Sequence, residues 1–80
     1  MTELFTQVDA VLARLVQFCV DYSLGYSYSL NMDGLTWRMK DYDSGLSLRI
    51  FIEKEVLRDG DPDEAVARVL ARWELEKLKR

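Results

Sequence analysis

The residues of this chain that could do chemistry are few, and their types argue against catalysis. The 80 residues include no histidine, the commonest general base and metal ligand in proteins. A serine or cysteine nucleophile would therefore lack the base that activates it in a catalytic triad. Cys19 is the only cysteine and lies on the apolar stripe of a predicted helix, so we expect a buried structural thiol. No glycine-rich phosphate loop occurs. The sequence predicts a protein that is not an enzyme and has no catalytic, cofactor-binding or metal-binding residues.

Three carboxylates stand at alternate positions late in the chain: Asp59, Asp61 and Asp63. A calcium loop begins in this way, but it needs glycine at its sixth position and glutamate at its twelfth, and those places hold Glu64 and Leu70. The alternative is that Asp61 caps a helix whose first residue is Pro62. We favour the cap, and the three aspartates remain candidates for an acidic contact edge.

A second set of candidates combines cations with aromatic rings on one face of a predicted sheet. Its members are Arg38, Lys40, Tyr42, Arg49 and Phe51. Like charges held close together repel one another, so a bound carboxylate or phosphate would relieve an unfavourable arrangement. The alternative is a solvated face whose charges are neutralised by Glu53, Asp41 and water. Both interpretations stay open.

The sheet itself is predicted from two alternating runs that meet at Asp33-Gly34. An Asp-Gly pair favours a two-residue type I′ turn, which requires positive φ at both central positions. On the apolar face this turn predicts the pairs Met32–Leu35, Leu30–Trp37, Tyr28–Met39 and Tyr26–Asp41. The polar residues then share the opposite face, as in a half-buried antiparallel sheet.

A third strand follows a second turn at Ser44-Gly45. An even-length loop keeps the apolar residues of this strand on the same face as those of its neighbour. The predicted pairs are Met39–Ile50 and Trp37–Ile52, with Lys40 near Arg49 and Arg38 near Phe51 on the other face.

Helices are predicted on both sides of the strands. Apolar residues at helical spacing run from Thr2 to Tyr22, with Thr2 as a cap and Gly25 as a left-handed terminator. The second helix runs from Pro62 to about Lys79. Its surface pairs would join Glu64 to Arg68 and Arg72 to Glu76. On the side away from the core lies a shallow apolar strip, a third candidate contact surface: Ala67, Ala71, Leu75 and Leu78.

The predicted fold is a single α+β domain spanning residues 1–80, with the order helix, three antiparallel strands, helix, and both helices on one sheet face. A composition of 49% hydrophobic and 31% charged residues is typical of a globular chain. The net charge of −3 disfavours general attraction to nucleic acid. No apolar tract has transmembrane length, no signal peptide is recognisable, and the single cysteine excludes an internal disulfide. We therefore expect a cytoplasmic protein that does not bind membranes.

These features predict a small non-enzymatic protein-interaction module, an inhibitor or adaptor of bacterial or phage origin. The element order resembles that of double-stranded RNA-binding domains, which implies RNA binding, but Pro62, Asp63 and Glu64 stand where that family presents lysines. In size, charge sign and lack of catalytic residues the chain is also similar to small phage proteins, including anti-CRISPR proteins that mimic nucleic acid. Two alternatives stay open: a nucleic-acid-binding regulator using the basic sheet face, and a homodimer formed through Leu75 and Leu78 of the second helix.

Overall fold

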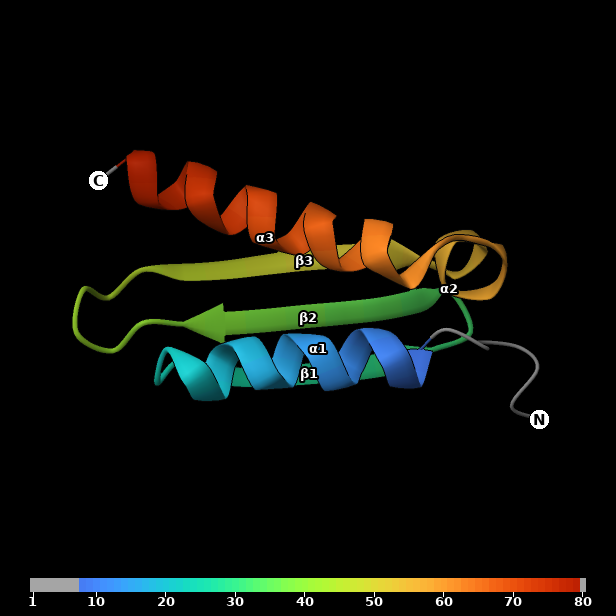
Figure 1. The fold of residues 1–80 in the computed structure, drawn as a ribbon, viewed down its shortest axis with the longest axis horizontal. Helices are drawn as coiled ribbons and strands as arrows, with labels where there is room; N and C mark the ends of the chain where they lie inside the picture. The colour runs from blue at the N-terminus through green and yellow to red at the C-terminus, as the bar shows by residue number, and fades with distance from the viewer. Residues whose placement is uncertain (1–7, 80) are drawn as a thin grey trace.

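The computed structural model describes residues 8–79 and places the helices on one face of a three-stranded sheet (Figure 1). The elements are α1 (Val8–Asp21), β1 (Gly25–Asn31), β2 (Gly34–Lys40), β3 (Ser47–Glu53), α2 (Lys54–Asp59) and α3 (Pro62–Leu78). The sheet is antiparallel with the order β1-β2-β3. The predicted α+β class is confirmed, whereas the short helix α2 was not predicted.

Helix α1 buries one stripe and ends one turn before the glycine that was predicted to stop it. Its buried residues are Val11, Leu15 and Cys19, while the predicted cap Thr2 lies outside the described residues. The left-handed position is Ser23, with φ 58°, and Gly25 is already the first residue of β1. The N–H of Leu24 donates to Cys19 O at 2.8 Å and that of Ser23 to Val20 O at 3.2 Å. These two bonds form a Schellman motif, so the prediction for Gly25 is wrong.

The turn between β1 and β2 is not the predicted type I′ turn. Its central residues are Met32 and Asp33, because Asn31 pairs with Gly34. Among the described non-glycine residues only Ser23 has a positive φ, so a type I′ turn is excluded here. The Asn31 side-chain oxygen instead accepts from the backbone N–H of Asp33 at 2.8 Å and of Gly34 at 3.3 Å. This side-chain bond closes the turn one residue earlier than predicted.

The earlier turn moves the register of β1 by two residues, and a shift of two leaves every side chain on its predicted face. The observed apolar-face pairs are Leu30–Leu35, Tyr28–Trp37 and Tyr26–Met39. Asp41 has no partner in β1, because β2 ends at Lys40. The predicted faces are therefore confirmed and the predicted pairs are wrong.

The connection from β2 to β3 is longer than the predicted Ser44-Gly45 turn. Asp41 N donates to Leu46 O and Gly45 N to Asp41 O, both at 2.8 Å, which closes the loop between Lys40 and Ser47. The register again moves by two residues, and the new pairs are Leu35–Ile52, Trp37–Ile50, Met39–Leu48 and Arg38–Arg49. An even-length loop was predicted, and the faces are unchanged.

Helix α3 begins as predicted. Asp61 is its N-cap and accepts a hydrogen bond from Asp63 N at 2.9 Å, with Pro62 at the first helical position. Proline suits this position because its missing N–H would have no partner there. The preceding α2 buries Leu57 completely and thereby attaches the β3–α3 connection to the core.

One hydrophobic core lies between the sheet and the helices. Its largest fully buried side chains are Trp37, Leu15, Leu35, Ile52, Leu57, Val11, Val69 and Cys19. The rings of Tyr26 and Tyr28 stack against Trp37, with centroid distances of 5.5 and 6.2 Å. Both tyrosines stay half-exposed because β1 is at the edge of the sheet.

Candidate functional site

The open face of the sheet carries three cations, Arg38, Lys40 and Arg49, which we call the basic cluster. Arg38 of β2 lies directly opposite Arg49 of β3, and Lys40 lies one same-face position further along β2, opposite Ser47. The sequence predicted Lys40 opposite Arg49, and that pairing is wrong. The actual register places Arg38 directly opposite Arg49, so the like-charge pair across the two strands joins two arginines.

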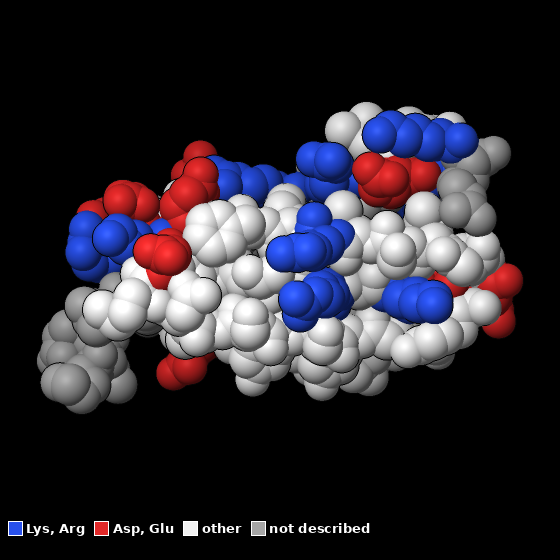
Figure 2. All heavy atoms as spheres, turned by 180° about the vertical axis from the view of Figure 1, so that it is seen from behind, with Lys and Arg blue, Asp and Glu red and all other residues white. Residues whose placement is uncertain are grey.

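The acids that were expected to neutralise this face are engaged elsewhere. Glu53 accepts from Arg68 of α3 at 2.8 Å, and Asp41 accepts from the backbone N–H of Asp43 at 3.0 Å. The bond from Arg68 lowers the pKa of the Glu53 carboxyl below its usual value of 4.5. Within residues 8–79 no ion pair joins the basic cluster to a carboxylate. Figure 2 shows this face, where white atoms, not red ones, surround the blue side chains near its middle.

Beside the basic cluster the surface is hollowed over about 370 Å³. The lining includes all three cations, Tyr42 and the hydroxyl residues Ser27 and Ser47. Lys40 Nζ lies 5.4 Å from the centre of the Tyr42 ring, a cation–π arrangement. The ring of Tyr42 also lies close over Gly25, where a Cβ would come within 2.6 Å of it. Several hydrogen-bond donors therefore surround a space large enough for an anionic side chain.

Phe51 and Tyr42 frame the basic cluster from opposite directions along the strands. Phe51 lies opposite Thr36, not opposite Arg38 as predicted, and is 45% exposed. Tyr42 belongs to the loop after β2 and is 71% exposed. All five residues predicted for this face are thus on it, and the lining of the hollow adds Ser27 and Ser47, which the alternation of their strands also places on this face.

Replacing Arg49 by glutamine should stabilise the fold by about 0.2–1 kcal/mol, because it removes a like-charge pair directly across the sheet. Arg72→Gln is the matched control: Arg72 donates to Glu76, so its loss should not stabilise. Urea unfolding followed by tryptophan fluorescence measures both variants. Salt at 1 M should reduce the gain, because it screens the repulsion. A lower free energy of unfolding for Arg49→Gln would contradict the repulsion between Arg38 and Arg49.

The predicted acidic edge is largely used for folding. Asp61 caps α3, Asp63 forms an ion pair with Arg14 of α1, and Asp59 pairs with Arg58 at 3.4 Å. The Arg14–Asp63 pair ties the start of α3 to α1, whereas the other two contacts are local to α2 and to the α3 cap. The structure therefore gives the three aspartates local partners, in contrast to the basic cluster.

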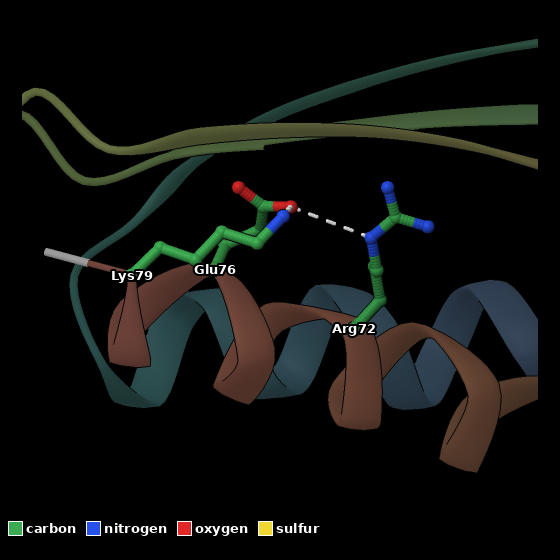
Figure 3. Close-up of polar contacts among 3 residues, drawn as sticks. All are labelled: Arg72, Glu76 and Lys79. Carbon is green, nitrogen blue, oxygen red and sulfur yellow. Dashed lines mark hydrogen bonds and ion pairs between the residues drawn. The ribbon is translucent and has the colours of Figure 1, made fainter.

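The apolar strip on α3 is exposed as predicted. Leu75 and Leu78 are 55% and 81% exposed, and the smaller Ala67 and Ala71 are also exposed. The charges of the same helix pair with one another: Glu76 accepts from Arg72 at 3.4 Å and from Lys79 at 3.5 Å (Figure 3). The Arg72 bond, with Lys79 nearby, holds the pKa of the Glu76 carboxyl below its usual value. The predicted Arg72–Glu76 pair is confirmed, whereas Arg68 pairs with Glu53 in place of Glu64.

Cys19 is buried in the core, as predicted for a structural thiol. Burial raises its pKa to about 11, so the thiol stays protonated near neutral pH and is a poor nucleophile. In the part of the chain that the structure describes, no group of three His, Cys, Asp or Glu side chains could hold a metal ion. Over the same residues, no helix has the length and apolarity needed to cross a membrane.

Comparison with known proteins adds no further constraint on this site. No protein-family model, curated protein or solved structure matches the chain.

Proposed function

We propose that this protein is a non-enzymatic interaction module that binds a carboxylate-rich segment of a partner protein on the open sheet face. The observation that carries the proposal is the opposed pair Arg38 and Arg49, with Lys40 beside it and no carboxylate partner among residues 8–79. Guanidinium groups bind carboxylates through two parallel hydrogen bonds, so they suit this ligand.

A short acidic segment fits the basic cluster better than a long polyanion does. The cations occupy one part of the face only, and the chain as a whole has a net charge of −3, which repels an extended phosphate backbone. A few carboxylates placed on the hollow would contact the cations and the neighbouring hydroxyl groups without approaching the acidic helix surfaces. Occupying a partner surface in this way is how a small inhibitor or adaptor would act.

The test is binding of a fluorescein-labelled oligoglutamate peptide, measured by fluorescence anisotropy at low salt. Wild type should bind it, and Arg38→Glu with Arg49→Glu should weaken binding about a hundredfold, since two charge-assisted contacts are reversed. Lys54→Glu with Lys79→Glu is the control: it changes the net charge equally at exposed positions away from the hollow and should bind nearly as wild type does. Equal loss in both double variants would reject the site.

Phe51 favours a second candidate, single-stranded nucleic acid. A ring that is 45% exposed beside two arginines can stack on a base while the arginines contact phosphates. An oligothymidylate probe in the same assay tests this function. It predicts that Phe51→Ala weakens oligonucleotide binding and leaves peptide binding unchanged. It also predicts that the affinity for the oligonucleotide falls steeply with salt. No binding at low salt would reject it.

A further inference from the structure

The outer edge of β1 is unprotected against pairing with another strand. Among residues 8–79 the strand is hydrogen-bonded to β2 on one side only, so alternate backbone N–H and C=O groups point outward. Edge strands of monomeric proteins usually carry a charge, a proline or a bulge that blocks further pairing. The seven residues of β1 include no charge and no proline, and their register with β2 is uninterrupted.

The other edge of the sheet is protected in the usual way. β3 carries Arg49 and Glu53, and Glu53 is held by Arg68 of α3. In Figure 2 the lower margin of the molecule, where Figure 1 places β1, is an almost continuous band of white atoms. Charged side chains therefore guard the β3 edge and not the β1 edge.

The apolar side chains of β1 form an ordered and half-exposed row. Tyr26, Tyr28 and Leu30 point to the helix-covered face, yet they are 44%, 47% and 42% exposed. Stacking on Trp37 holds both tyrosine rings, so they would lose little side-chain entropy on contact. Residues of this kind, beside unpaired backbone groups, are typical of a contact surface.

We propose that β1 pairs antiparallel with β1 of a second copy, about a two-fold axis at Tyr28. In this register Tyr28 lies opposite itself, Tyr26 opposite Leu30 and Ser27 opposite Ser29, and all seven residues of the strand have a partner. Apolar side chains meet on the helix-covered face and serines meet on the open face. No like charges are brought together, which a self-pairing strand requires.

The dimer would join the two sheets into one and place both basic clusters on the same open face. Arg38 lies one strand inside β1, so the two Arg38 residues would be three strand spacings apart across the sheet, about 14 Å. If the proposed carboxylate binding holds, an acidic segment could engage both clusters. The dimer itself does not depend on that function.

Matched variants on the open face test this register. Ser27→Glu with Ser29→Glu sets glutamate against glutamate at both serine pairs of the dimer, whereas Ser27→Glu with Ser29→Lys sets glutamate against lysine. Sedimentation equilibrium should show a dimer for wild type and for the Glu/Lys variant, and a dissociation constant about tenfold higher or more for the Glu/Glu variant. Both serines are exposed, so the monomer fold is preserved, which circular dichroism checks.

A charge-swap experiment tests the two-fold position. Tyr28→Lys and Tyr28→Glu should each be monomeric alone and should form a heterodimer when mixed, since only this residue faces itself. Met32→Lys, in the turn beyond the strand, should leave the dimer intact.

A wild type that stays monomeric at millimolar concentration would overturn the proposal. So would equal association of the two double serine variants, or a dimer that Leu75→Glu dissociates.

Discussion

Gly34→Ala should destabilise the fold by about 3 kcal/mol or more, through backbone strain and a clash that no side-chain movement relieves. Gly34 has φ 151°, a conformation that residues with a Cβ rarely adopt. A Cβ there would come within 2.2 Å of Ile52 O and 3.2 Å of Glu53 Cα, both backbone atoms of β3. The two strands would have to separate at the position where the β1–β2 turn, β3 and the start of α2 meet.

Gly45→Ala is the matched control for this effect. Gly45 also has a positive φ, 79°, but nothing lies within 4 Å of its added Cβ. Gly45→Ala should therefore lower the free energy of unfolding only by the cost of a left-handed backbone, about 1–2 kcal/mol. Urea unfolding followed by tryptophan fluorescence gives both values. Equal losses would show that strain alone, and not contact with β3, makes Gly34 necessary.

Trp37→Ala should cost about 3–5 kcal/mol, which is a large part of the roughly 4–12 kcal/mol expected for a chain of 80 residues. Trp37 is fully buried in the middle strand, and both β1 tyrosines stack on it. Its removal would leave a cavity beneath the helices and would release Tyr26 and Tyr28. We expect a strongly reduced melting temperature, or a chain that no longer unfolds cooperatively.

Two further variants identify the origin of that loss. Tyr42→Ala removes an aromatic ring that is 71% exposed and should change stability by less than about 0.5 kcal/mol. Trp37→Phe keeps much of the packing and removes an indole N–H that has no hydrogen-bond partner within residues 8–79. It should therefore cost less than Trp37→Ala. A Phe variant as unstable as the Ala variant would mean that the indole N–H contributes a bond after all.

The element types followed from the sequence because they depend on local signals. The period of apolar residues in α1, the Asp61-Pro62 start of α3 and the alternation in the strands each act over a few neighbours. Helix α2 was missed since six residues are too few for a helical period, and burial of Leu57 stabilises them. Ser23 replaced Gly25 as helix terminator because hydrogen bonds to Cys19 and Val20 select the position, whereas residue preference alone favours glycine.

The identity of the residues on the open sheet face could be derived from alternation alone, which is insensitive to a register shift of two. The distances between these residues could not be derived from alternation. Asn31 and the loop between Asp41 and Leu46 set both registers through hydrogen bonds that composition does not reveal. The sequence therefore specified which cations share a surface, and only the folded sheet decided that Arg38 faces Arg49 and that Glu53 is held by Arg68. Pairing across strands joins residues that are distant in the chain. The tertiary structure therefore decides which charged residues of the sheet have an oppositely charged partner and which do not.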